Sequence, residues 1–185
     1  MKKLIAFLPA ILFFFHLFGQ CPTGNLLLST QAEIDNFPIN YPNCTSTFNS
    51  LEINGNSITN LQGLSSLQTV GDLTIKNNPN LTSLSGLDNL QSTFVFLFRN
   101  NDSISDFSGL ENLTFATDII VEYNNSLTSL QGLNNVQGTF ILDINSNPSL
   151  TGIDAFLDSL KSAMQVIIRA NPLITNLNGL EVTLA

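Results

Sequence analysis

The sequence predicts a mostly β repeat protein, a solenoid of about six coils of 23–24 residues with one short parallel strand in each coil. Three observations lead to this prediction. A Gly-Leu pair recurs at a constant spacing, a short alternating apolar segment precedes each pair, and an asparagine follows each alternating segment at the same place. A unit of this length cannot bury its own apolar side chains, so neighbouring units must stack and share one core.

The first twenty residues have the three-part layout of a secretory signal peptide. Two lysines precede an apolar run over residues 4–18, and Gly-Gln then leads to Cys21. The apolar run is shorter than the roughly 20 residues that a membrane-spanning helix needs. We therefore expect removal of residues 1–20, no membrane span after cleavage, and a secreted protein that is extracellular or on the cell surface.

Residues 21–48 are expected to form an N-terminal cap bounded by a disulfide. Cys21 and Cys44 are the two cysteines of the chain, and an exported chain with an even number of cysteines is normally oxidised. Such a bridge stabilises a domain by roughly 3 kcal/mol through the lost entropy of the unfolded chain. The alternative is a lipoprotein signal with lipid on Cys21, although Gln20 stands where a small residue is usual. The two alternatives exclude each other, because both use the Cys21 sulfur.

Residues 49–185 are expected to form the repeats, without a C-terminal cap. In each repeat two apolar residues flank one residue, which is the period of 2 typical of a strand with one buried face. The next apolar residues are three apart and suit a turning segment that returns the chain to the next strand. The strand pairs are Leu51/Ile53, Leu73/Ile75, Phe96/Phe98, Ile119/Val121, Leu142/Ile144 and Val166/Ile168.

A glycine begins each Gly-Leu pair. A glycine at a repeated position indicates backbone with a positive φ or a close approach between coils. Because Ala155 takes this position in the fifth repeat, we expect that coil to turn differently. The glycines are Gly63, Gly86, Gly109, Gly132 and Gly179, and the first four are evenly spaced.

An asparagine follows each predicted strand. A side-chain amide offers two donors and an acceptor, so it can satisfy backbone groups of its own turn and of the next coil. We therefore expect a structural asparagine ladder; a role in ligand binding is the less favoured alternative. The ladder residues are Asn56, Asn78, Asn101, Asn124, Asn147 and Asn171.

The motif LTIKNNPNLTSLSGL over residues 73–87 resembles leucine-rich repeat proteins and, more closely, the receptor L-domain family. The resemblance covers roughly residues 44–180, and the segment from Cys21 to Cys44 is similar to the leader of such domains in exported proteins of Bacteroidetes-like bacteria. It implies a right-handed solenoid and an extracellular recognition role, and no enzymatic activity. Ala155 departs from the pattern. The chain also stops at Ala185, where relatives often continue, so we expect a longer parent protein as one alternative.

The charge of the chain argues against nucleic-acid and membrane partners. The formal net charge is −8, and removal of the two lysines with residues 1–20 brings it to about −10. Such a field repels phosphate backbones and anionic lipid. We expect no nucleic-acid binding and no electrostatic docking to an anionic membrane.

The sequence offers few groups for catalysis. The single histidine, His16, lies in the expected signal peptide, which leaves the mature chain without Ser-His-Asp, Cys-His or histidine-based metal sites. Asp72 and Asp118 fall in one column with Val95 between them, so their carboxyls would lie roughly 9.5 Å apart. A solvated strand edge explains this pair better than the paired carboxylates of a glycosidase. We expect no catalytic residue, no cofactor and no metal; a carbohydrate-active β-helix enzyme is the least favoured alternative.

The outward side of the strands is the candidate interaction surface. It carries apolar residues where water is expected, and an apolar patch beside charged residues is typical of interaction surfaces. We expect a non-enzymatic binding module for a protein or a glycan. The alternatives are a structural spacer or adhesin segment of a longer surface protein, or a patch covered by a loop or a second domain. Neither the ligand nor the oligomeric state follows from the sequence. The surface comprises Val95, Leu97, Arg99, Ile120, Glu122 and Ile167.

Overall fold

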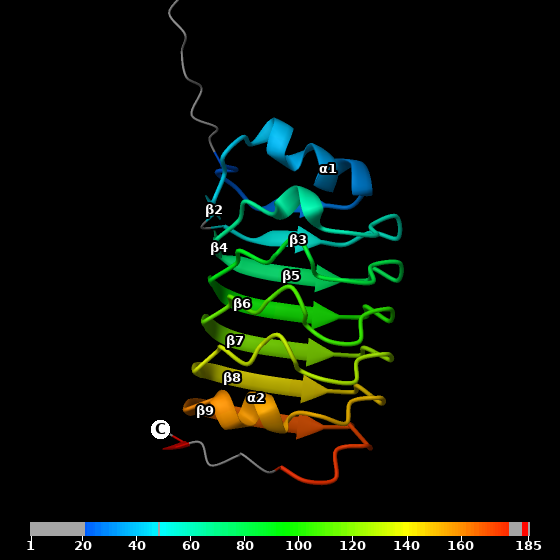
Figure 1. Cartoon of the computed structure of the whole chain (residues 1–185), viewed down its shortest axis with the longest axis vertical. Helices are drawn as coiled ribbons and strands as arrows, with labels where there is room; N and C mark the ends of the chain where they lie inside the picture. Colours follow the sequence, from blue (N-terminus) through cyan, green and yellow to red (C-terminus); the bar gives the residue numbers. More distant parts are fainter. Residues whose placement is uncertain (1–20, 48, 178–182, 185) are drawn as a thin grey trace, which may run out of the picture.

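The computed structural model describes residues 21–47, 49–177 and 183–184. Within these residues the protein is mostly β, with a parallel sheet and few helices, and the main strands lie side by side in chain order (Figure 1). The prediction of a mostly β protein with parallel strands is therefore confirmed. The expected signal peptide and the last Gly-Leu pair, which begins at Gly179, lie outside the described residues.

The sheet runs from the N-terminal leader to the end of the chain. Two additional short strands, β2 (Ser46–Thr47) and β4 (Thr69–Val70), pair with each other, and β4 also pairs with β6. The main strands, in the order in which they are paired, are β1 (Leu26–Leu28), β3 (Leu51–Ile53), β5 (Asp72–Lys76), β6 (Ser92–Arg99), β7 (Phe115–Glu122), β8 (Gly138–Asn145), β9 (Ser162–Arg169) and β10 (Thr183–Leu184).

The register between strands repeats the period of the sequence. Phe96 of β6 is paired with Ile119 of β7, and Ile119 with Leu142 of β8, so each of these steps equals the spacing of the Gly-Leu pairs. The step is one residue shorter between β3 and β5 and one residue longer between β8 and β9. Each inward-facing side chain therefore lies beside the equivalent side chain of the next strand, and one face of the sheet stays buried.

Strands β6 to β9 are eight residues long, longer than the short strands predicted. The extra length comes from a corner near the beginning of each strand. In β6, Thr93 and Phe96 are both buried although they are three residues apart, and Phe94 between them is exposed. The Thr93 hydroxyl donates to the carbonyl oxygens of Gly71 and Val95, at 2.8 and 3.0 Å, which satisfies backbone groups at the corner.

The N-terminal segment over residues 21–47, called the leader below, belongs to the same sheet as the repeats. Strand β1 pairs with β3, so the expected cap over residues 21–48 supplies the first strand. Helix α1 (Gln31–Asn40) follows and covers this end of the sheet, burying Ile34 and Phe37 (Figure 1). The helix begins with a capping box, in which Thr30 accepts from the Glu33 backbone and Glu33 accepts from the Thr30 backbone.

Cys21 and Cys44 form a disulfide, with their Cα atoms 5.0 Å apart. This confirms the pairing predicted from the even number of cysteines. Because both sulfurs are used in the bridge, the Cys21 sulfur is not available for lipid attachment, the alternative considered from the sequence. Cys44 is buried at the start of the core, so the bridge fixes Cys21, the beginning of the leader, to the buried end of the same segment.

The glycines of three Gly-Leu pairs have the positive φ that a glycine at a repeated position predicts, and the turns of the first and fifth repeats differ from them. Gly86, Gly109 and Gly132 have φ values of +108°, +107° and +102°, a region that other residues rarely adopt. The first pair lies in the short 3-10 helix η1 (Gln62–Leu64). In the fifth repeat, helix α2 (Asp154–Ser159) takes the place of this turn and Ala155 is exposed. The prediction of a different turn at Ala155 is therefore confirmed.

One continuous core runs along the stack of strands. In its middle, the ring of Phe107 lies edge-on to Phe96 and Phe98, with centroids 5.7 and 5.0 Å apart. At the C-terminal end, Val166 and Ile168 are only partly buried, whereas the equivalent residues of β8 are fully buried. The turning segments contribute the buried columns Ile58, Leu81, Ile104, Leu127, Leu150 and Leu61, Leu84, Phe107, Leu130, Ile153.

Candidate binding surface on the sheet

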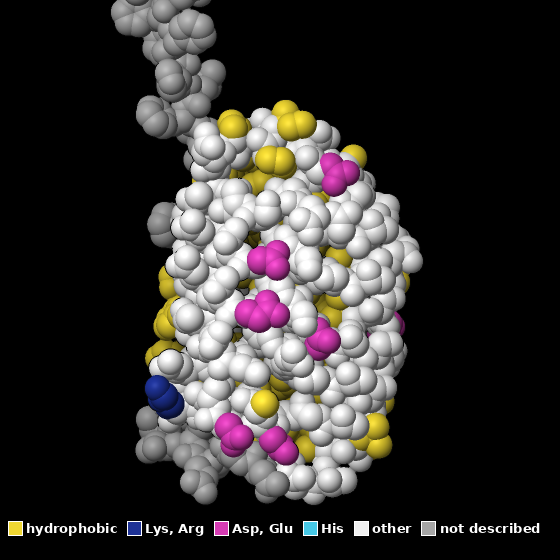
Figure 2. Space-filling view, in the orientation of Figure 1, with side chains coloured by type: hydrophobic (Ala, Val, Ile, Leu, Met, Phe, Trp, Pro, Cys, Tyr) yellow, Lys and Arg dark blue, Asp and Glu magenta, His cyan; other side chains and the backbone are white. Residues whose placement is uncertain are grey.

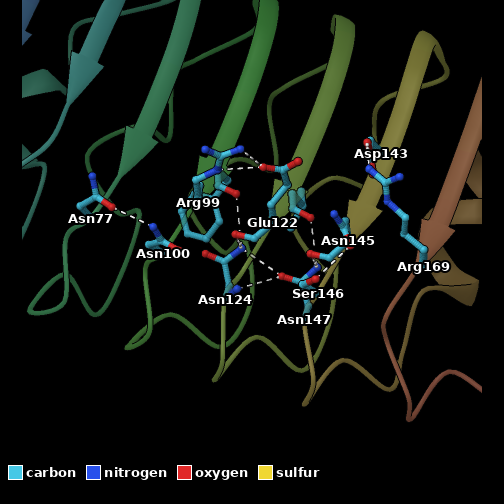
Figure 3. Close-up of polar contacts among 12 residues, drawn as sticks. Asn77, Arg99, Asn100, Glu122, Asn124, Asp143, Asn145, Ser146, Asn147 and Arg169 are labelled. Carbon is cyan, nitrogen blue, oxygen red and sulfur yellow. Dashed lines mark hydrogen bonds and ion pairs between the residues drawn. The ribbon is translucent and has the colours of Figure 1, made fainter.

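A row of buried asparagines joins the ends of the strands. We name it the asparagine ladder, and Asn101 illustrates its bonding: the side-chain amide donates to the carbonyl oxygens of Ile75 and Arg99, at 2.9 and 3.0 Å. The side-chain oxygen of Asn101 accepts from the backbone and side-chain N–H groups of Asn78, at 3.2 and 3.0 Å. The same pattern links Asn124 to Asn147 (Figure 3). The ladder comprises Asn78, Asn101, Asn124, Asn147 and Asn171.

Asn56 does not belong to the ladder, although its sequence position predicts it. The backbone N–H of Gly55, and not that of Asn56, donates to the side-chain oxygen of Asn78 at 2.9 Å. Ile53 is paired with Ile75, and Asn56 stands three residues after Ile53 as Asn78 stands three residues after Ile75, so counting from the strand predicts Asn56. The turn after β3 is one residue shorter than the turn after β5, so Gly55 occupies the ladder position instead. The side chain of Asn56 is exposed.

The outer face of the sheet brings the predicted surface residues together. We define the outer face by the outward side chains of β6 to β9, which form two columns across the strands. One column contains Val95, Asp118, Ile141 and Gln165, and the other contains Leu97, Ile120, Asp143 and Ile167. The apolar members are partly exposed, and Leu97 lies directly beside Ile120. Ile167 is separated from Ile120 by Asp143, so the apolar patch is interrupted by a carboxylate.

A row of charged side chains borders the outer face where the strands end. Arg99 donates to Glu122 through two nitrogens, one of them at 2.8 Å (Figure 3). The Arg99 guanidinium lies 5.7 Å from the centre of the Tyr123 ring. Tyr123 is exposed and has a φ of +56°, which is unusual for a bulky residue. A second ion pair joins Lys76 to Glu52 at 3.0 Å. Arg99 and Glu122 thus act as a pair on the surface predicted from the sequence.

Asp143 is a polar residue of this surface that was not predicted from the sequence to belong to the site. Its side chain is 14% exposed, and the outward isoleucines of β7 and β9 are paired with it on both sides. One carboxylate oxygen lies 3.5 Å from Arg169, whereas Oδ1 is buried without a hydrogen-bond partner among the described residues. Burial raises the pKa of the Asp143 carboxyl; Arg169 opposes this shift and Glu122 adds to it.

The raised pKa of Asp143 predicts a change in stability with pH. The folded state binds this proton more tightly than the unfolded chain, so the stabilisation is complete below the unfolded pKa of about 3.9. It is lost as the pH rises through the higher folded pKa. Relative to the wild type, Asp143→Asn should therefore gain stability as the pH rises from acidic to neutral. Urea unfolding across this range measures the difference, and two parallel stability curves would contradict it.

A second surface feature, an apolar groove, lies at the beginning of strands β7 to β9. The groove has a volume of about 510 Å³ and is lined by the first residues of these strands and by the residues just before them. Phe115, Phe140 and Met164 line it and are each about half exposed. Figure 2 shows hydrophobic side chains along the left edge, where Figure 1 shows these strands beginning. The groove was not predicted from the sequence, because the predicted strands begin after the corner.

Comparison with known proteins identifies no relative: no protein-family model, no curated protein and no solved structure matches the chain. Among residues 21–47, 49–177 and 183–184, no group of three or more acidic, cysteine or histidine side chains has an arrangement that could hold a metal ion. The same part of the chain contains no helix with the length and hydrophobicity of a membrane span.

Proposed function

We propose that this protein is an exported, non-enzymatic recognition module that binds a protein or a glycan through the outer face of β6 to β9. We further propose that it is a right-handed solenoid of the leucine-rich-repeat or receptor L-domain type. One observation carries the functional proposal: the outer face combines partly exposed apolar side chains with a buried carboxylate oxygen, Asp143 Oδ1, that has no hydrogen-bond partner among the described residues.

The unpaired oxygen favours a partner that donates a hydrogen bond. A buried acceptor without a partner costs about 1–3 kcal/mol, and a ligand that donates to Oδ1 after rotation of the 14%-exposed Asp143 side chain removes this cost. Sugar hydroxyls, amides and ammonium groups all supply such a donor. The adjacent Ile120 and Ile167 would then bury apolar surface at about 25 cal/mol per Å². The pair Arg99–Glu122 at the border contributes to orientation more than to affinity.

The size of the outer face agrees with a compact epitope. Strands are spaced by about 4.8 Å, so four of them span roughly 15–20 Å, and five residues along a strand span roughly 15 Å. This area is smaller than the roughly 800 Å² that each partner contributes to a standard protein interface. The outer face is therefore large enough for a few sugar residues, or for the central anchor of a protein contact.

Export of the module is supported by two features. The segment over residues 1–20 has the layout of a signal peptide, and Cys21 and Cys44 form a disulfide. Disulfides persist in oxidising compartments and are rare in the cytosol. A recognition surface outside the cell is consistent with both features.

Substitution at the centre of the outer face tests the proposed function. Ile120→Glu places a charge beside Asp143 and should weaken binding at least tenfold, while the fold is kept because Ile120 points outward. The measurement is saturable binding of the labelled, disulfide-bonded protein to cells of the organism that produces it and to an array of defined glycans. The wild type should bind one of these with a measurable dissociation constant.

Thr74→Glu provides the matched control. Thr74 occupies the same outward column one strand before Leu97, so it receives the same new charge outside the apolar patch. Binding of Thr74→Glu should equal that of the wild type. If Ile120→Glu binds as tightly as Thr74→Glu, or if no saturable binding exists, the outer face is no recognition site and a structural spacer is the better proposal.

A further inference from the structure

The floor of the apolar groove is formed where β8 begins with a glycine. Gly138 is paired with Ser162 of β9, and a Cβ built on Gly138 would lie 2.8 Å from the Ser162 hydroxyl oxygen, which can rotate away, and 3.7 Å from the Ser162 carbonyl oxygen. The missing side chain leaves a depression in the sheet surface. The side chains of Phe115, Phe140 and Met164 stand around this depression, with 49%, 55% and 56% of their surfaces exposed.

The lining of the groove is uncharged, and the Lys161 ammonium group is hydrogen-bonded to one of the lining residues. None of the eleven lining residues is ionisable. Lys161 precedes β9, and its side-chain nitrogen donates to the side-chain oxygen of Gln137, a lining residue, at 3.0 Å. In Figure 2 the visible Lys or Arg side chain lies next to the hydrophobic left edge, while Asp and Glu are scattered over the rest of this face. A positive group beside an apolar groove is complementary to an amphiphilic anion.

The exposed area argues for a small ligand and against a second copy of the chain. An aromatic side chain buries about 150–250 Å² when fully covered, so the half-exposed Phe115 and Phe140 offer about 200 Å², and with Met164 the total is about 300 Å². A stable dimer needs about 800 Å² from each partner. The volume of about 510 Å³, in contrast, falls within the range of small-molecule sites, about 300–1,000 Å³.

We propose that this groove binds a free fatty acid, with the alkyl chain over Gly138 between Phe115 and Phe140, and the carboxylate at Lys161. The site is separate from the outer face, so it does not depend on the function proposed above. Each methylene removed from water strengthens binding about fourfold, and affinity should rise with chain length until the groove is filled. The preference for an anion is local to Lys161, because the chain as a whole is acidic.

Filling the depression tests the site without removing a core contact. Gly138→Val covers the floor, and valine is favourable in a strand where φ is not positive. The probes are octanoate and decanoate, titrated calorimetrically into the exported, disulfide-bonded protein. The wild type should bind decanoate more tightly than octanoate, and Gly138→Val should lose at least tenfold in affinity with an unchanged or higher Tm. Equal affinities of the wild type and Gly138→Val would overturn the proposal.

Two further arms keep the result interpretable. Lys161→Gln, at an exposed position, should weaken octanoate severalfold and leave octanol unchanged; equal binding of octanoate and octanol by the wild type would overturn the assigned head group. If Gly138→Val does not fold, Phe140→Ser replaces it as the test. Phe140 is also exposed, and its loss removes one wall of the groove, so Phe140→Ser should weaken the binding of decanoate.

Phosphatidylglycerol vesicles test the other source of an alkyl chain. If the wild type binds no decanoate but sediments with the vesicles, and Gly138→Val abolishes this co-sedimentation, the ligand is membrane lipid and the proposal of a free fatty acid is contradicted.

Discussion

Asn101→Ala should lower the free energy of unfolding by about 3–5 kcal/mol, because several buried groups lose their partners at once. The carbonyl oxygens of Ile75 and Arg99 lose a donor, and the backbone N–H of Asn78 loses its acceptor. Asn101 is fully buried, so water cannot replace these bonds without opening the turn. Thermal and urea unfolding should both report the loss, with Tm falling by about 10 °C.

Asn56→Ala is the matched control for the ladder. It removes the same amide from the equivalent place in the sequence, but from an exposed side chain outside the ladder. Its stability should stay within about 0.5 kcal/mol of the wild type. An Asn101→Ala protein as stable as Asn56→Ala would contradict the role given to the asparagine ladder.

Gly132→Ala should destabilise the protein by about 4 kcal/mol, the sum of backbone strain and overpacking, which each cost about 1–3 kcal/mol. A Cβ at this position would stand 2.0 Å from the carbonyl oxygen of Phe107 and 2.3 Å from its carbonyl carbon. These are backbone atoms of the preceding turn, and they cannot move without disturbing the core contacts of Phe107. Alanine also disfavours the φ of +102°.

Gly152→Ala separates this effect from the general effect of replacing a glycine. The nearest atom to a Cβ at Gly152 is the carbonyl oxygen of Thr128, at 4.0 Å, and its φ is not positive. Alanine there should be neutral or stabilise by about 0.4–1 kcal/mol, because it restricts the unfolded chain. Similar losses of stability in Gly132→Ala and Gly152→Ala, measured by urea unfolding, would contradict a special role of the glycine column.

The repeated parts of the fold were predictable because their physical causes recur at a fixed spacing. Alternation at pairs such as Phe96/Phe98 indicates a strand with one buried face, and the constant step to Ile119/Val121 indicates parallel neighbours. The asparagine ladder followed from the bonding capacity of an amide at a repeated position, with Asn56 as its one error. That error arose because the turn after β3 is shorter, which the strand spacing does not reveal.

The parts that were missed depend on features that occur once or on three-dimensional neighbours. Helix α1 had a local signal, the capping box of Thr30 and Glu33, which does not belong to the repeat. The burial of Asp143 depends on the isoleucines of two other strands, and an acid at an outward position normally indicates a solvated site. The groove depends on the corner in the strands, which brings Gly138 and Phe140 to the surface together.

The intact mass of the protein recovered from outside its producing cells, before and after reduction, tests the central claim most directly, because a recognition module of this kind must be exported. We predict a chain that begins at Cys21 and gains two hydrogen atoms when the Cys21–Cys44 bridge is reduced. A chain that is found only inside the cell, begins at Met1 and has free thiols would contradict export. A lipid increment on Cys21 would contradict the Cys21–Cys44 bridge.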